Sequence, residues 1–108
     1  MKTLNFNGIT SILLEDVKAN KVSEEINQYI LWEGENGKHT AIYTFEKNAK
    51  LPFIDSHDKY DEHIYVLEGT FNDGKDNHKK GSYIVNPKGT IHHPQSVDDG
   101  CTVLVTFQ

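Results

Sequence analysis

The sequence predicts an all-β protein that folds as a sandwich or a barrel. Short runs rich in Ile, Val, Tyr, Phe and Thr recur along the chain, turn-forming residues separate them, and no convincing helical pattern interrupts them. Many short strands at such spacing are typical of antiparallel sandwiches and barrels. A chain of 108 residues is long enough for one hydrophobic core, and we expect a single domain over residues 1–108.

Six segments are expected to form strands, because each contains the β-branched and aromatic residues that sheets favour. They are residues 9–14, 28–33, 40–45, 63–71, 82–86 and 101–107. The stretches GENGK, NDGK, NPKG and DDG between them supply the Gly, Asn, Asp and Pro that tight turns require. Only residues 15–27 have some helical character, and Val17, Val22 and Ile26 are too sparse there to form an apolar stripe.

The charge pattern argues against nucleic-acid binding. The formal net charge is -5, and the sequence contains no arginine. Its one short lysine cluster, Lys75, Lys79 and Lys80, is interleaved with aspartates. A nucleic-acid surface needs basic side chains gathered on one face, so we expect no nucleic-acid partner.

The hydropathy pattern argues against a membrane protein. No segment approaches the roughly 20 apolar residues that a membrane span requires. The first residues, MKTLNFNGIT, lack the apolar core of a secretory signal. The single Cys101 cannot form an internal disulfide. These features predict a cytoplasmic protein, with Cys101 as a small buried apolar residue at the head of a strand.

The stretch HDKYDEHIYVLEG brings histidines and carboxylates to the start of an expected strand. Side chains alternate between the two faces of a strand. An extended chain therefore places Asp55 and His57 on one face, and it places Glu62 on the same face as Ile64 and Val66. Two such strands side by side can direct Asp55, His57 and Glu62 into one cavity.

A further donor comes from the stretch GSYIVNPKGTIH at residues 81–92. Glycines allow the chain to reverse there, and Pro87 fixes a turn that re-aims His92. Neutral imidazole and carboxylate groups are ligands for Zn, Fe, Ni, Cu and Mn. His39 and His78 stand in polar, turn-like surroundings and are interpreted as surface or hydrogen-bonded histidines without an assigned role.

The two segments resemble the paired motifs of the cupin superfamily, a small jelly-roll β-barrel with a metal inside. In the first motif a histidine is followed by a glutamate after four residues and a glycine after six more, as in His57, Glu62 and Gly69. The spacing of the second motif is met by Gly81, Pro87, Gly89 and His92. The motifs occupy about residues 55–69 and 81–92.

The closer resemblance is to the branch of ChrR-type zinc anti-sigma factors and diketone-cleaving dioxygenases. It rests on EHIYVLEGTF and NPKGTIHHPQSVDDGC and covers roughly residues 40–107. The resemblance implies one divalent transition metal, Fe, Zn, Mn, Ni or Cu, held by His57, Glu62 and His92. Asp55 stands where the family usually has another histidine, and it is a candidate fourth ligand.

Four residues near the two motifs, His63, His93, Tyr65 and Tyr83, are candidates to lie beside the metal ligands or to line the pocket. By strand alternation, His63 faces away from Glu62, although its place beside the glutamate leaves open a role as ligand. His93 faces away from His92 by the same argument and is expected beside the site or at the surface. Tyr65 and Tyr83 are candidates to line a substrate pocket, with the barrel core as the alternative.

The resemblance implies three classes of function. The first is a metal-dependent oxidoreductase of the dioxygenase kind, acting on a small oxygenated molecule such as a diketone. The second is a sensory or regulatory module without catalysis, although ChrR-type proteins carry a zinc-binding segment and no Cys/His cluster precedes residue 39 here. The third is a structural or ligand-storage barrel. A small-molecule ligand and a homodimer formed through an edge strand are the expected partners.

Overall fold

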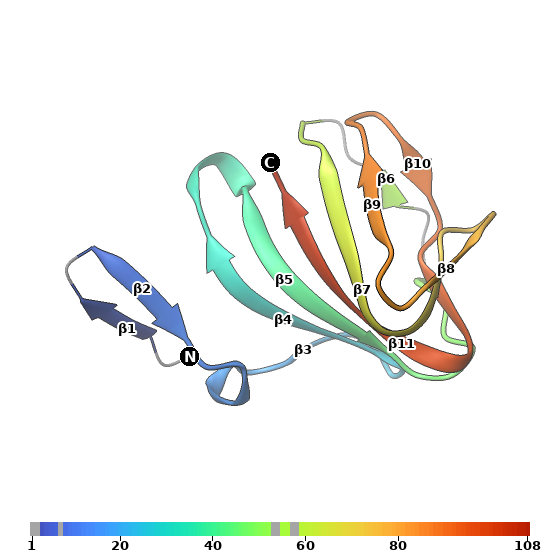
Figure 1. Ribbon diagram of the computed structural model, residues 1–108, viewed down its shortest axis with the longest axis horizontal. Coiled ribbons are helices and arrows are strands. Elements are labelled where there is room, and N and C mark those ends of the chain that lie inside the picture. The colour runs from blue at the N-terminus through green and yellow to red at the C-terminus, as the bar shows by residue number, and fades with distance from the viewer. Residues whose placement is uncertain (1–2, 7, 53–54, 57–58) are drawn as a thin grey trace.

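The computed structural model describes residues 3–6, 8–52, 55–56 and 59–108, with side chains from residue 8 onward except at 55–56. Strands make up most of this part of the chain, which confirms the predicted all-β class (Figure 1). The strands are β1 (Thr3–Phe6), β2 (Ile9–Ile12), β3 (Asn20–Ser23), β4 (Ile26–Glu33), β5 (His39–Phe45), β6 (Asp55–Ser56), β7 (Glu62–Asn72), β8 (Asn77–Lys79), β9 (Tyr83–Asn86), β10 (Ile91–His92) and β11 (Gln95–Phe107). Two 3-10 turns, η1 (Leu14–Asp16) and η2 (Glu35–Gly37), complete the described elements.

Each of the six predicted strands is present, although the boundaries differ. The last predicted strand began at residue 101, whereas β11 begins at Gln95 and runs for 13 residues. The window 15–27 holds the end of η1, the strand β3 and the start of β4 rather than a helix. Its buried apolar residues are far apart, since Val17 and Ile26 are buried while the residues between them are exposed or half-buried.

The main sheet is antiparallel and has the strand order β3-β4-β5-β11-β7-β8, with β9 also paired to β7. The long strand β11 lies at its centre and joins β5 to β7. A separate two-stranded ribbon is formed by β6 and β10 (Figure 1). The sheet curls so that one face encloses the interior of the barrel.

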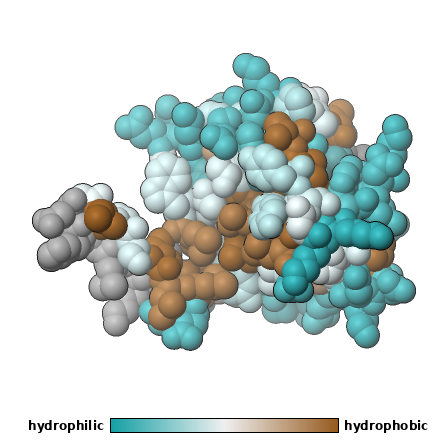
Figure 2. Space-filling model, viewed as in Figure 1, coloured by the Kyte–Doolittle hydropathy of each residue, from teal (hydrophilic) through white to brown (hydrophobic). Residues whose placement is uncertain are grey.

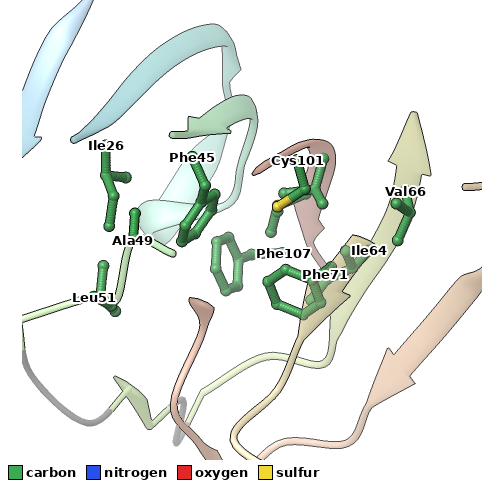
Figure 3. Close-up of a cluster of buried hydrophobic side chains, with 11 residues drawn as sticks. Ile26, Phe45, Ala49, Leu51, Ile64, Val66, Phe71, Cys101 and Phe107 are labelled. Atoms are coloured by element: carbon green, nitrogen blue, oxygen red, sulfur yellow. The ribbon is translucent and has the colours of Figure 1, made fainter. Parts of the chain in front are cut away.

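The core fills the concave face of this sheet. Figure 3 shows the rings of Phe45, Phe71 and Phe107 beside one another at its centre. The rings of Phe45 and Phe71 meet edge to face, with centroids 6.1 Å apart. Ile64 and Val66 of β7 and Val103 and Val105 of β11 are also buried. Because side chains alternate along both strands, these buried apolar residues lie on the inner face and the residues between them lie on the outer face.

One end of the barrel is closed by tight backbone packing, and we call it the closed end, defined by Phe45, Gly69, Gly100 and Cys101. Gly69 pairs with Cys101 between β7 and β11. Both glycines have positive φ, +72° and +69°, and a Cβ built on Gly69 would lie 2.1 Å from the carbonyl oxygen of Gly100. Only glycine at position 69 permits the two strands to approach this closely.

The loop after β5 covers the closed end through hydrogen bonds to the start of β11. The Ser96 hydroxyl donates to the carbonyl oxygen of Glu46 (2.5 Å) and accepts from the backbone N–H of Ala49 (3.1 Å). The N–H of Leu51 donates to the carbonyl of Pro94 (2.9 Å). Ser96 is buried, so these bonds satisfy its hydroxyl in the interior.

The β1–β2 hairpin projects from the barrel, as the blue elements of Figure 1 show. Apolar side chains gather where the hairpin and η1 meet the barrel (Figure 2). Ile9, Leu13 and Leu14 are all exposed in this region. No helix among the described residues is long and apolar enough to cross a membrane.

Candidate functional site

The end of the barrel opposite the closed end carries polar side chains, and we call it the mouth, defined by His39, Glu62, Asn86 and Phe107. These residues form one transverse row, because Phe107 of β11 pairs with His39 of β5 and with Glu62 of β7, and Glu62 pairs with Asn86 of β9. The row lies at the upper end of the view in Figure 1, near the C-terminus. Paired residues in a sheet point to the same face, and this face is the inner one.

A cavity of about 370 Å³ opens at the mouth and extends into the barrel. Its wall is mostly aromatic and aliphatic. The aromatic residues are Tyr43, Phe45, Tyr60, Phe71 and Phe107. The polar groups are few and come from Gln28, His39, Glu62 and His92, besides the hydroxyls of the tyrosines. An apolar cavity with a few convergent polar groups is the usual form of a small-molecule site.

Glu62 and His92 form the most buried polar pair of the cavity. Their exposed fractions are only 3% and 7%. Nε2 of His92 lies 2.8 Å from Oε1 of Glu62, and the side-chain amide of Asn86 donates a hydrogen bond to the same carboxylate oxygen (3.1 Å). Glu62 is held by the long strand β7 and His92 by the short strand β10, so two segments that are distant in sequence meet at this point.

The geometry of this pair fits two adjacent ligands of one metal ion. Two ligand atoms that each lie about 2.1 Å from a metal and about 90° apart are separated by about 3.0 Å. The 2.8 Å between Nε2 of His92 and Oε1 of Glu62 is close to this value, and it is also the length of a direct hydrogen bond between the two groups. Among the residues whose side chains the structure describes, no group of three or more His, Cys, Asp or Glu is arranged to hold a metal ion. The described donors therefore fit part of a metal site.

The predicted ligands His57 and Asp55 can be followed only in part. His57 lies outside the described residues. The backbone of Asp55 is described, and it pairs with His92 in the ribbon of β6 and β10. The first motif therefore runs alongside the second, as a shared site requires.

His63 and His93 face away from the cavity, as strand alternation predicted. His63 is half-buried on the outer face of β7, where its Nδ1 is hydrogen-bonded to the hydroxyl of Tyr83. Nε2 of His93 donates to the carbonyl oxygen of Leu51 (2.8 Å), which ties β10 to the loop that precedes β6. Neither histidine lines the cavity.

Tyr65 and Tyr83 do not lie in the pocket or in the core, and the sequence-based prediction for both is corrected here. Their exposed fractions are 41% and 61%. They pair with each other across β7 and β9 on the outer face. The physical reason is the period of two: Glu62, Ile64 and Val66 occupy the inner face of β7, which leaves Tyr65 outside.

His39 is a cavity residue that the sequence did not reveal. It is half-buried at the mouth, and its ring packs on Phe107 with centroids 4.6 Å apart. The alternation His39, Ala41, Tyr43, Phe45 along β5 could have placed it on the inner face, since Ala41 and Phe45 are both buried. The polar turn that precedes it concealed this pattern.

His78 has the structural role that its surroundings suggested. Its Nε2 lies 2.9 Å from Oδ2 of Asp73 in the turn between β7 and β8. Burial raises the pKa of the Asp73 carboxyl, but hydrogen bonds from the N–H of Asp76, from His78 and from the N–H of Lys75 outweigh it and hold the pKa below its ordinary value. Asp73 and His78 fasten this turn and do not line the cavity.

Sequence comparison identifies one matching family. The family model for the ChrR Cupin-like domain matches residues 10–108, which contain both motifs. No curated protein matches the chain.

Solved structures show the same fold. A chain in the crystal structure of Rhodobacter sphaeroides SigE in complex with the anti-sigma ChrR matches with a TM-score of 0.72 and 22% identity. The match covers 89% of this chain and 52% of that one, so this chain spans about half of its length. An RmlC-like cupin from Shewanella frigidimarina matches with a TM-score of 0.77 and 17% identity (99% and 93% covered). The polyketide cyclase RemF from Streptomyces resistomycificus matches with a TM-score of 0.73 and 20% identity (92% and 78% covered).

Proposed function

The chain belongs to the ChrR cupin-like domain family, and on this premise we propose that its barrel binds one divalent transition metal ion through His57, Glu62 and His92. The observation that carries the proposal is the buried contact between Glu62 and His92 at the mouth of the cavity. A buried carboxylate is costly unless it is paired or binds a metal. His57, which lies outside the described residues, is the third ligand in this proposal, and the pairing of β6 with the strand of His92 supports it.

Two further residues shape the proposed metal site. Asp55 is a fourth ligand in this proposal, and its carboxylate favours harder ions such as Mn over softer ones such as Cu. Asn86 holds Oε1 of Glu62 from the other side, which fixes the orientation of the carboxylate. Ni and Cu remain within the range of ions that imidazole and carboxylate groups bind.

The proposed ligand is a small oxygenated molecule such as a diketone, and the proposed activity is that of a metal-dependent dioxygenase. A metal ion bound at Glu62 and His92 would supply Lewis acidity toward a carbonyl or enolate oxygen. The chain's own residues define the rest of the site: Phe45, Phe71 and Phe107 exclude water from the cavity. The volume of about 370 Å³ is at the small end of ligand pockets.

A regulatory module without catalysis is the second candidate, and the family match favours it. One structural neighbour is the anti-sigma ChrR in complex with SigE. In this candidate the cavity binds a metal or a small ligand and does no chemistry. Homodimerisation is proposed for both candidates, since β3 lies at an edge of the sheet order, where backbone groups are open to pairing. A cytoplasmic location stays a prediction.

Metal content of the purified protein tests the metal site. We expect about one equivalent of metal per chain after incubation with Fe, Mn, Zn, Ni or Cu salts and removal of loosely bound ions. His92→Ala and Glu62→Ala are each expected to lose it. His78→Ala is the matched control, because it removes a histidine outside the cavity. A folded protein that takes up no metal, or variants that retain it fully, would refute the proposed ligands.

Oxygen consumption separates the two candidate functions. The iron-loaded or copper-loaded protein is mixed with 2,4-pentanedione, and dissolved oxygen is recorded together with loss of the diketone. Uptake that depends on the metal and disappears in His92→Ala supports the dioxygenase. Metal binding without oxygen uptake supports the regulatory module.

A further inference from the structure

His39 has a fixed tautomer that prepares it to accept a hydrogen bond. Its Nδ1 lies 2.8 Å from the carbonyl oxygen of Gly37. A carbonyl oxygen can only accept, so Nδ1 must carry the proton. In a neutral imidazole the other nitrogen, Nε2, is then the acceptor. The ring lines the cavity and packs on Phe107, which holds its plane.

The turn that holds His39 is itself anchored to the other side of the mouth. The carbonyl oxygen of Asn36 accepts a hydrogen bond from the hydroxyl of Tyr60 (2.5 Å), which comes from the segment leading into β7. The Lys38 ammonium lies 5.8 Å from the centre of the Tyr60 ring. Gly37 therefore lies in a turn that contacts with Tyr60 hold in place. The carbonyl oxygen that fixes His39 thus has a defined position at the rim of the cavity.

His39 and Glu62 lie two strands apart at the mouth. His39 and Glu62 lie on β5 and β7, with Phe107 of β11 between them in the same row. Two strand spacings separate their Cα atoms by about 10 Å. Between them lies an apolar floor, to which Val105 and Ile64 contribute. One small molecule can thus reach both sides while its middle contacts apolar groups.

We propose that His39 Nε2 accepts a hydrogen bond from a hydroxyl group at the far end of a ligand whose dicarbonyl oxygens bind the metal ion proposed at Glu62 and His92. This assigns a substrate class: a 1,3-dicarbonyl compound with an apolar middle and a hydroxyl at the end away from the dicarbonyl, of which a 4-hydroxyphenyl dicarbonyl is one example. The inference rests on the proposed metal site, and it makes His39 the residue that selects among ligands.

The test compares two probes that differ by one hydroxyl, 1-phenylbutane-1,3-dione and 1-(4-hydroxyphenyl)butane-1,3-dione. Binding to the zinc-loaded protein is measured by calorimetry, since zinc has no redox chemistry that would consume the probes. We expect the hydroxylated probe to bind about tenfold more tightly. His39→Phe should bring the two affinities within about twofold, His39→Gln should retain part of the preference through its amide oxygen, and His78→Phe should leave it unchanged.

The outcomes separate this inference from the metal site. If both probes bind and the preference is absent, or persists in His39→Phe, the role of His39 is refuted while the metal site stands. If the protein takes up zinc but binds neither probe, the dicarbonyl class is refuted together with His39. If no zinc is bound, the metal site itself is refuted, and with it this inference.

A measurement without metal checks the tautomer directly. The signals of the two His39 ring nitrogens are identified by their absence from the spectrum of His39→Phe. Their chemical shifts at neutral pH should show a protonated Nδ1 and an unprotonated Nε2. A ring protonated at Nε2 would refute the proposed acceptor role, whatever the binding results.

Discussion

The two ends of the barrel use the same strands for different purposes. At the closed end, Gly69 and Cys101 of β7 and β11 approach so closely that no side chain fits between the backbones. At the mouth, the same two strands present Glu62 and Phe107 to an open cavity. The comparison shows that close backbone packing is found at one end of these paired strands and buried polar groups at the other. Stability and function should therefore respond to mutations at different ends.

The largest effect on stability is expected at the closed end, from Gly69→Ala. The new Cβ would lie 2.1 Å from the backbone oxygen of Gly100, and alanine would be strained at φ +72°. We expect a loss of about 3 to 5 kcal/mol in the free energy of unfolding, measured by urea denaturation. Gly81→Ala is the control, because φ is +92° there and no atom lies within 4 Å of its Cβ. It should cost about 1 kcal/mol. Equal losses would show that the close approach at Gly69 does not matter.

The second prediction concerns the mouth, where a double substitution should leave the free energy of unfolding unchanged or raise it. Replacing Glu62 and His92 together by leucine removes a buried polar pair. Such replacements are often neutral or stabilising, so the metal-free double variant should unfold at the same or a higher urea concentration. Its affinity for zinc should fall by about 100-fold or more, measured by competition with a chelator. A strongly destabilised double variant would mean that the mouth, like the closed end, is built for stability.

The third effect concerns Cys101, whose exposed fraction is 5%. Burial, with a smaller effect from the Asp99 carboxylate, raises the pKa of this thiol from 9.0 to about 12. The thiol's contribution to stability is complete below pH 9 and is lost as the pH rises toward 12, because the unfolded chain releases the proton first. Relative to Cys101→Ala, the wild type should lose up to about 1.4 kcal/mol per pH unit in that window. Parallel pH profiles of the two proteins would contradict the raised pKa.

The smallest effect is expected on the outer face, midway between the two ends. Tyr65→Thr and Tyr83→Thr each alter an exposed cross-strand pair and introduce a β-branched side chain that suits a strand. We expect each to cost less than about 1 kcal/mol in thermal or urea unfolding, with zinc uptake unchanged. Loss of zinc in either variant would connect the outer face to the mouth.

Much of the fold could be predicted because it depends on local rules. The period of two correctly separated Glu62 from His63 and His92 from His93, since a strand fixes the faces of its residues. The same rule, applied consistently, would have placed Tyr65 outside the barrel and His39 inside it. Both errors arose because other features were given more weight than position in the strand. For Tyr65 this feature was its aromatic ring, and for His39 it was the polar turn beside it.

Other features could not be predicted because they depend on contacts between distant segments. The sequence marks Gly69 and Gly100 as turn or motif residues, and only the pairing of β7 with β11 shows why their side chains must be absent. The ribbon of β6 and β10 has two residues in each strand, too few for any periodic pattern. The metal ligands were assigned by resemblance and stay a prediction, whereas the structure shows that Glu62 and His92 are in contact.

The central position of β11 also bears on how the barrel assembles. The hydroxyls of Thr40 and Thr106 are 3.2 Å apart although 66 residues separate them in sequence. Until β11 is in place, nothing in the strand order joins β3, β4 and β5 to β7, β8 and β9. Contacts between residues so far apart in sequence form slowly, because a long stretch of chain must be closed into a loop. Folding should therefore take milliseconds to seconds. During synthesis, β3 to β5 and β7 to β9 can form two half-sheets before the ribosome releases residues 95–107. The inner faces of both half-sheets are exposed at that stage, and a chaperone would recognise them.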